Sequence, residues 1–227
     1  AVYDFEKAPT VDAAGPLLAA PEPATEEVTG ETYGALKAEC DRIVRDVCGE
    51  KASIVRPTYV VGPGDTTDRF TYWVERFHRG GDIVCPAYPE VEVQWIDARD
   101  LAALFTTIAE NATFGIFNGV GPASPMTNEQ LMHGLRAFAN VPTRLFWPPG
   151  TLLEELDYST PMFGTDGESI HVGASAAIAA GLSYRSLADT VRDTHEWWQS
   201  QPAERRANPR RWPTPAQERA VLQRLGA

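Results

Sequence analysis

The chain has 227 residues, a formal net charge of −11 and a hydrophobic fraction of 43%. This length and apolar content suit one large domain, or a domain with an appendage, and argue against wholesale disorder. The acidic balance argues against a nucleic-acid or anionic-membrane binder, because both partners require a basic face, and no apolar run reaches the roughly 18 residues of a membrane span.

The three cysteines are Cys40, Cys48 and Cys85. Their number and spacing favour reduced thiols over a disulfide framework or a zinc site, and this predicts a cytoplasmic protein. Cys40 and Cys48 lie eight residues apart on a predicted helix, so both could face its core. The four histidines are scattered without metal-ligand spacing, so we expect no metal site.

The first predicted elements are a loop, a helix and a strand. Residues 5–30 are rich in proline, alanine and threonine and predict a surface loop. Thr32 is a suitable N-cap, Gly49 a suitable end, and apolar residues recur between them at helical spacing. Residues 52–57 then predict a buried strand that ends at a proline. The apolar residues that we expect on the buried face of the helix are Leu36, Cys40, Ile43, Val44 and Val47.

Helix and strand patterns alternate through the middle of the chain. They predict a helix over 70–78, a strand over 91–96, a helix capped by Asp97 or Asp100, a strand over 114–118, a capping-box helix over 127–139 and a strand over 143–147. Such alternation indicates an α/β fold with mostly parallel strands. A parallel sheet needs further strands and covered faces, so we expect additional structure upstream of this chain.

The C-terminal third predicts helices over 174–180 and 187–198, a polar connector over 202–215 and a last helix over 215–225. The connector carries a basic cluster. We interpret this cluster as a solvated tail rather than an anion or partner site. Its members are Arg205, Arg206, Arg210 and Arg211.

Tyr33 and Lys37 are the clearest candidates for chemistry. A spacing of four residues places both side chains on one helix face. A nearby cation favours the phenolate and lowers a tyrosine pKa from about 10, so such a tyrosine can exchange a proton with an alcohol or a carbonyl. Lys37 could also donate to a ribose hydroxyl. The same pair also fits a solvated lysine beside a half-buried tyrosine.

Four segments together resemble the second half of the extended short-chain dehydrogenase/reductase family, the NAD-dependent epimerase/dehydratases. The resemblance covers residues 1 to about 198. Its segments are Thr29-Gly-Glu-Thr-Tyr33-Gly-Ala-Leu-Lys37-Ala-Glu39, Ile54-Val-Arg-Pro-Thr-Tyr-Val-Val-Gly-Pro-Gly-Asp65, Asp68-Arg-Phe70 and Gln94-Trp-Ile-Asp-Ala-Arg-Asp-Leu-Ala102.

The resemblance implies a role for each matching residue. Tyr33 matches the catalytic acid/base, and Lys37 matches its partner, which also binds the nicotinamide ribose. Arg69 and Arg99 match positions near the substrate, although a surface arginine and a helix-capping ion pair are the structural alternatives. The segment matching the backbone against the nicotinamide is Pro57, Thr58, Tyr59 and Val60, which also fits a strand end turned by proline.

The resemblance also implies a fold: the C-terminal part of a Rossmann-like, doubly wound parallel sheet with a smaller mixed α/β substrate lobe. We expect residues 1–120 in the sheet domain, 121–201 in the substrate lobe with its closing helices, and 202–227 in a tail with a short helix. The cofactor would be NAD or NADP and the other ligand a small molecule. Helices 32–48 and 98–110 could pair in a homodimer.

The family's Gly-rich pyrophosphate turn has no counterpart in this sequence, and its catalytic Ser or Thr would fall just before residue 1. The chain also lacks an initiator Met. We therefore expect a fragment that is inactive alone and lacks an upstream half on the order of 100 residues, at about 30 residues per βαβ step. Two alternatives stay open: a non-catalytic relic that binds a ligand or partner, and a separate chain that supplies the missing half.

Overall fold

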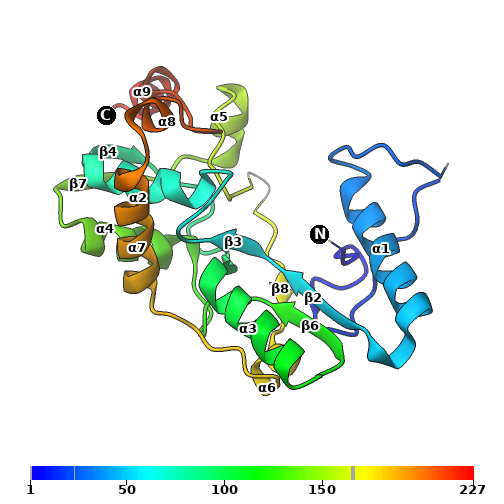
Figure 1. Cartoon of the computed structure of the whole chain (residues 1–227). Coiled ribbons are helices and arrows are strands. Elements are labelled where there is room, and N and C mark those ends of the chain that lie inside the picture. Colours follow the sequence, from blue (N-terminus) through cyan, green and yellow to red (C-terminus); the bar gives the residue numbers. More distant parts are fainter. Residues whose placement is uncertain (1, 23, 165–166) are drawn as a thin grey trace. The chain divides into compact units, whose positions relative to one another are not determined.

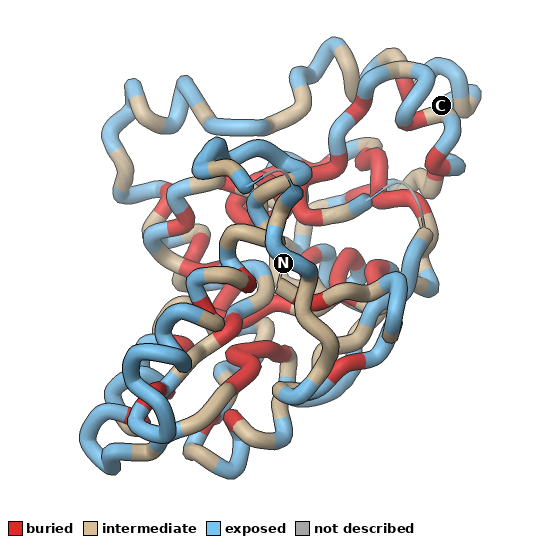
Figure 2. The backbone as a smooth tube through the Cα atoms, turned by 90° about the vertical axis from the view of Figure 1, so that its right-hand side faces the viewer, coloured by how far each residue is buried: buried red, intermediate tan, exposed pale blue. Residues whose placement is uncertain are grey.

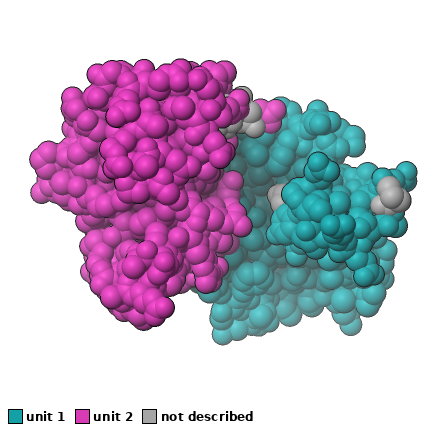
Figure 3. Space-filling model, turned by 90° about the horizontal axis from the view of Figure 1, so that it is seen from above, with its two compact units in different colours: residues 1–58, 94–123, 170–184 teal, residues 59–93, 124–169, 185–227 magenta. Residues whose placement is uncertain are grey.

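The computed structural model describes residues 2–22, 24–164 and 167–227 (Figure 1). Residue 1, where the predicted sheet domain begins, and Pro23 in the predicted loop lie outside this described part. The chain forms two compact units that interleave along the sequence (Figure 3). Unit 1 takes residues 1–58, 94–123 and 170–184, and unit 2 takes residues 59–93, 124–169 and 185–227.

Unit 1 is built on short parallel strand pairs. β2 lies beside β6 in register from Ser53 opposite Gly115 to Pro57 opposite Gly119. β1 lies beside β8, with Thr10 opposite His171. The elements of unit 1 are β1 (Thr10–Val11), α1 (Tyr33–Cys48), a 3₁₀ turn (Gly49–Lys51), β2 (Ser53–Pro57), β5 (Trp95–Asp97), α3 (Ala98–Glu110), β6 (Gly115–Gly119), β8 (His171–Val172) and α6 (Ser175–Ala179).

The core of unit 1 lies where α3 and α6 pack on the β2–β6 pair (Figure 1). α3 begins sharply because the Asp97 carboxylate accepts from the backbone N–H of Arg99. Its apolar residues then recur at helical spacing and point to the strands. The buried members of this core are Ile96, Leu101, Leu104, Ile108, Phe117, Ala177 and Leu182.

Unit 2 is a helical body with one parallel strand pair, in which β4 lies beside β7 and Gly81 stands opposite Thr143. α2 packs against both α4 and α7. The elements of unit 2 are β3 (Tyr59–Val61), α2 (Arg69–Arg79), β4 (Gly81–Val84), α4 (Asn128–Ala139), β7 (Thr143–Phe146), α5 (Gly150–Glu155), α7 (Leu187–Ser200), α8 (Ala203–Ala207) and α9 (Pro215–Arg224).

α2 is the most buried helix of unit 2 (Figure 2). Every residue from Phe70 to Phe77 is buried. The Trp73 indole donates to the Pro161 carbonyl at 2.7 Å, so its polar atom has a partner in the core. α2 ends at Gly80, where φ is 69° and an added Cβ would lie 2.5 Å from the Val141 side chain. A glycine fits this turn for both reasons.

Most predicted elements are confirmed, including the capping box at Thr127 and the helix end at Gly49. The strand predicted over 91–96 is wrong for its first part, because only Trp95 and Ile96 of that range lie in β5. The strand predicted as buried over 52–57 is half-exposed. Among the described residues, four strands and two helices were not predicted: β1, β3, β4, β8, α5 and α8.

The buried face expected for α1 is wrong. Only Ala38 and Asp41 are buried on this helix, whereas Val47 is 80% exposed. Helical spacing indicates a face that can pack but does not say what covers it, and no described residue covers this one. The residues of the expected face that are exposed are Cys40, Ile43, Val44 and Val47, and Cys48 is exposed as well.

Two residues of the basic cluster that we expected to be a solvated tail instead contact a buried acid. Arg205 forms an ion pair with Asp68, and the backbone N–H of Arg210 donates to the same carboxylate. The local sequence could not show this, because the partner lies more than 130 residues away. No helix among the described residues is both long and apolar enough to cross a membrane.

Candidate active site

The helix that carries Tyr33 and Lys37 begins at a turn fixed by two threonines. The Thr29 backbone N–H donates to the Thr32 hydroxyl oxygen at 2.9 Å, and the Thr32 N–H donates to the Thr29 hydroxyl oxygen at 3.2 Å. The Thr32 hydroxyl in turn donates to the Glu27 carbonyl at 2.6 Å. The expected N-cap is thus at Thr32, but its side chain holds the preceding turn instead of the helix N–H groups.

Tyr33 and Lys37 occupy the first and second turns of α1. Tyr33 is 48% exposed, and Lys37 is also exposed. Neither the hydroxyl nor the ammonium has a hydrogen bond or ion pair with another described residue. Both side chains therefore keep their full capacity to bind a ligand from the helix surface.

α1 is anchored one turn beyond Lys37 by the buried residue Asp41. Its carboxylate accepts from the Arg56 guanidinium of β2, at 2.8 Å from Nε and 2.5 Å from the terminal nitrogen. Both side chains are almost completely buried. One Asp41 oxygen, Oδ1, is buried without a partner among the described residues. This ion pair holds the Tyr33–Lys37 helix to the strand pair of unit 1.

Arg56 also joins the N-terminal segment to the strand pair. It donates to the Tyr3 hydroxyl at 2.8 Å, and the Tyr3 hydroxyl donates to Asn118 at 2.6 Å. Asn118 donates onward to the Gly173 carbonyl at 2.9 Å. This buried network was not predicted. A charged arginine within the apolar strand sequence is the signal that could have indicated a buried partner.

The segment Pro57 to Val60 follows the end of β2. The Thr58 hydroxyl donates to the Gln94 carbonyl at 3.1 Å, so unit 1 fixes this side chain. In unit 2, Tyr59 is 38% and Val60 is 40% exposed. The segment thus combines a fixed strand end with accessible side chains, which suits a binding role as well as a plain strand end.

Arg99 lies at the start of α3 and forms a two-point contact with its own helix cap. Its Nε is 2.9 Å from one Asp97 oxygen, and a terminal nitrogen is 2.7 Å from the other. Asp97 is fully buried, so the pair resembles the structural alternative. Burial first, and then the Asp100 carboxylate, raises the pKa of nearby Tyr184, whose hydroxyl donates to the Val120 carbonyl.

Arg69 lies in unit 2 at the first position of α2. Its guanidinium carbon is 4.8 Å from the centre of the Tyr59 ring, and its Nε donates to the Thr67 hydroxyl at 3.0 Å. A guanidinium stacked on an aromatic ring keeps free N–H groups for an anion. Among the predicted substrate residues, Arg69 has the geometry of a ligand contact more clearly than Arg99.

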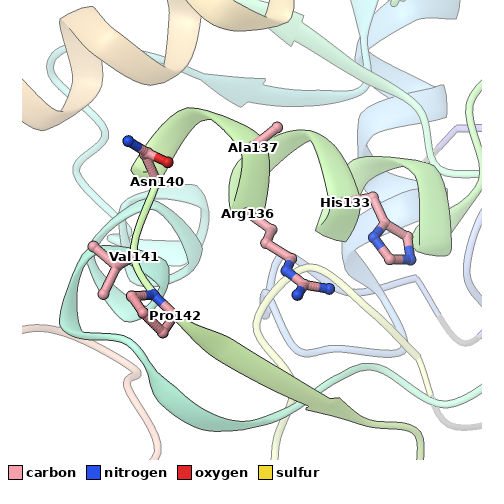
Figure 4. Close-up of a pocket in the computed structure, with 6 residues that line it drawn as sticks. All are labelled: His133, Arg136, Ala137, Asn140, Val141 and Pro142. Carbon is pink, nitrogen blue, oxygen red and sulfur yellow. The ribbon is translucent and has the colours of Figure 1, made fainter.

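A shallow hollow of about 570 Å³ lies at the C-terminal end of α4 (Figure 4). The His133 and Arg136 side chains leave the helix on one side, and Val141 and Pro142 follow from the turn. None of the predicted site residues lines this hollow. In the described part of the chain, no group of His, Cys, Asp or Glu side chains could hold a metal ion.

Comparison with known proteins found one family model and several solved structures that are similar to this chain. A family model described as the NAD dependent epimerase/dehydratase family matches residues 8–119. No curated protein matches the chain. Among solved structures, a human epimerase family protein with NADPH is similar at 19% identity and a TM-score of 0.55, over 85% of this chain and 60% of that one.

Two bacterial structures are similar in the same way. The UDP-glucose 4-epimerase of Thermus thermophilus with NAD matches at 16% identity and a TM-score of 0.52, over 81% of this chain and 60% of that chain. WbmG of Bordetella bronchiseptica, with NAD and UDP, matches at 14% identity and a TM-score of 0.54, over 85% of this chain and 53% of that chain.

These similarities show the fold of this chain and how much of each solved structure it covers. The predicted Rossmann-like α/β class with parallel strands is confirmed. The chain spans about three fifths of the length of the solved structures that it resembles.

Proposed function

We propose, from the match of residues 8–119 to the model of the NAD dependent epimerase/dehydratase family, that the chain carries the proton-transfer and substrate-binding part of an NAD(P)-dependent enzyme. The reaction would be an epimerisation, dehydration or reduction at a carbon that bears a hydroxyl or a carbonyl. We further propose that the chain alone is inactive.

The observation that carries the proposal is the Tyr33–Lys37 face of α1. Both side chains are exposed and lack partners among the described residues, while the buried Asp41–Arg56 pair fixes the helix below them. A rigid helix with two free polar groups is what precise proton transfer requires.

The residues fit the nicotinamide end of a dinucleotide. The Lys37 ammonium can donate to ribose hydroxyls, and the accessible Pro57–Val60 segment can lie against a flat ring. When bound, the nicotinamide supplies or accepts a hydride. The Tyr33 hydroxyl gives a proton to the substrate carbonyl oxygen, or takes one from a substrate alcohol, and Lys37 stabilises the phenolate by its charge.

The substrate class follows from Arg69. A guanidinium stacked on Tyr59 with N–H groups available suits a phosphate or carboxylate. A nucleotide sugar carries both a diphosphate and a sugar hydroxyl, so it is the substrate class we propose. Arg99 would serve as a second substrate contact only if it leaves Asp97.

The test is turnover in a longer polypeptide that includes the upstream segment, assayed by NAD(P)H absorbance. Tyr33→Phe should lower kcat at least 100-fold, within the usual range for a general acid/base. Lys37→Met should lower kcat and raise KM for the cofactor. Tyr88→Phe is the matched control, because it removes a tyrosine hydroxyl outside the proposed site. Unchanged turnover in Tyr33→Phe would exclude the proposed role.

Calorimetric titration separates the enzyme from a non-catalytic relic. We expect no tight binding of NADH or NADPH to the chain alone, and stoichiometric binding to the longer polypeptide. Tight binding of NADH or NADPH by the chain alone would contradict the proposal that this chain is inactive because it cannot hold the cofactor by itself. If the longer polypeptide binds a substrate analogue but not the cofactor, the relic is the correct interpretation.

We also propose a cytoplasmic homodimer. The cytoplasm is supported by the three free thiols. The dimer is supported by exposed apolar side chains on the two helices that the resemblance assigns to pairing, namely Val47 of α1 at 80% and Phe105 of α3 at 49% exposure. The mass of the protein in solution, measured by light scattering, tests this proposal.

A further inference from the structure

The C-terminal segment contacts the loop that precedes Arg69. We call residues 203–212 the C-terminal strap. The Arg205 guanidinium lies 2.5 Å from one oxygen of the Asp68 carboxylate. The Arg210 backbone N–H lies 2.7 Å from the other oxygen. The strap therefore satisfies both oxygens of one buried acid.

Two further bonds join the strap to the backbone of the same loop. The Trp212 indole donates to the Asp68 carbonyl at 2.9 Å. The Arg210 guanidinium donates to the Thr66 carbonyl at 2.7 Å. Together the strap contributes four polar contacts to two residues of this loop, Thr66 and Asp68, far more than a solvated tail would make.

Asp68 depends on these contacts for two reasons. Its side chain is completely buried, and a buried carboxylate without partners is strongly unfavourable. Its backbone lies in the left-handed region, with φ at 58°, which aspartate adopts more readily than most residues but less readily than glycine. The contacts with the strap stabilise this conformation.

The strap is itself held by the aromatic core of unit 2. The Arg205 guanidinium carbon lies 4.9 Å from the Trp198 ring centre. The Trp212 ring lies 5.4 Å from Trp198 and 5.7 Å from Tyr72. Arg205 thus has a contact with Trp198 in addition to its ion pair with Asp68, and this contact helps to hold the strap against the loop.

The residue placed by this loop is Arg69. It follows Asp68 directly, and its guanidinium lies on Tyr59 and bonds to Thr67, which is the residue before Asp68. If Asp68 leaves the left-handed conformation, the chain direction at Arg69 changes, and both contacts are lost.

We propose that Arg205 and Asp68 are positioning residues that hold the Arg69 guanidinium on the Tyr59 ring, so that the C-terminal strap controls an anion-binding site at Arg69. The placement of Arg69 by Arg205 and Asp68 is argued from the contacts above. The binding of an anion at Arg69 rests on the proposed function. The anion would be a phosphate or diphosphate group of a substrate.

The first experiment reads the position of Arg69 without any ligand. In ¹⁵N NMR spectra, stacking on Tyr59 should shift the Arg69 Nε–H resonance upfield through the ring current; Arg69→Lys assigns the signal and Tyr59→Leu confirms its origin. Arg205→Gln should abolish the shift, and Arg205→Lys should restore part of it. Asp68→Asn tests the charge, because asparagine tolerates a left-handed backbone.

Arg206→Gln is the matched control. Arg206 is the exposed neighbour of Arg205, and it bonds to Gln199 and the Gln201 carbonyl, not to the loop. This variant should keep the Arg69 shift. Amide shifts of β4 and β7 show whether each variant is folded. A folded Arg205→Gln protein with an unchanged Arg69 signal would overturn the positioning role.

The second experiment titrates the chain with UDP, and separately with inorganic pyrophosphate, while the Arg69 signal is followed. Arg205→Gln should weaken binding of both probes about tenfold relative to Arg206→Gln. Equal affinities in the two variants would overturn control of the site by the strap. If the wild-type chain binds neither probe, the anion site and the nucleotide-sugar proposal fail together, and the ligand-free spectra still decide the positioning.

Discussion

α1 and α2 show two ways of holding a helix that presents candidate site residues. α1 has 16 residues, of which only Ala38 and Asp41 are buried, and its link to the sheet is the ion pair with Arg56. α2 has 11 residues, and its whole centre is buried against α4 and α7. One helix is joined to the strand pair through a buried ion pair, and the other is buried by packing along its length.

The difference matters for function. A helix anchored through one buried pair leaves its remaining surface accessible, and Tyr33 and Lys37 lie on that surface. A helix that is buried along its length cannot present side chains there, and its proposed binding residue, Arg69, is at the N-terminal end. In α1, we therefore expect the free energy of unfolding to fall most when a mutation removes the charge of the buried pair. In α2, we expect it to fall most when a mutation removes buried side-chain volume.

The largest effect is expected in α2. Trp73→Ala removes a fully buried ring and its hydrogen bond to the Pro161 carbonyl. The free energy of unfolding should fall by about 4 kcal/mol, as for other buried aromatic truncations. Urea denaturation followed by circular dichroism measures this loss. Trp197→Ala, at a half-buried position of α7, is the control and should lose clearly less.

The next largest effect is expected at the anchor of α1. Asp41→Ala leaves the Arg56 guanidinium buried without its carboxylate, which should cost about 3 kcal/mol. Hydrogen exchange should show the loss as faster exchange of α1 amides, while α2 amides keep their protection. Removing the arginine charge as well, in Asp41→Ala with Arg56→Met, should recover part of the loss. An equal loss in the double variant would show that α1 is not held by this charge pair.

The two helices also show what the sequence could predict. The Tyr33–Lys37 spacing and the Thr127 capping box are local patterns, and both appear in the structure as predicted. The buried face of α1 could not be predicted, because an apolar stripe does not identify its partner. The two-residue strand β1 has no periodicity and exists only through its distant partner β8. The sequence also assigns Arg205 to a solvated tail, because its partner Asp68 is remote in the sequence and no local pattern links the two.

A smaller effect is expected at alkaline pH in the core around α2. Burial raises the pKa of Tyr72 to about 12, and burial also raises the pKa of Tyr158, its hydrogen-bond partner. Because the folded protein holds the Tyr72 proton more tightly, stability is complete below the unfolded pKa of about 10 and falls as pH rises toward 12. The loss should be about 2 kcal/mol.

Denaturation curves between pH 9 and 12 measure this alkaline loss. Tyr72→Phe should flatten the decline, because the titrating hydroxyl is gone. Tyr33→Phe is the control, since its hydroxyl is exposed on α1, and the decline should remain. A decline that is the same in Tyr72→Phe as in the wild type would assign the alkaline loss to other groups.

The smallest effect is expected for the substitution of valine by alanine, which can be made in both helices. Val74→Ala in α2 should cost about 2 kcal/mol, because Val74 is fully buried and the cavity adds to the lost transfer energy. Val47→Ala in α1 should change the free energy of unfolding by less than about 0.5 kcal/mol, because Val47 is 80% exposed. At low protein concentration, a large cost at Val47 would mean that its side chain is covered within one chain. A cost that appears only as the protein concentration rises would instead place Val47 in an interface between two copies, because association then contributes to stability.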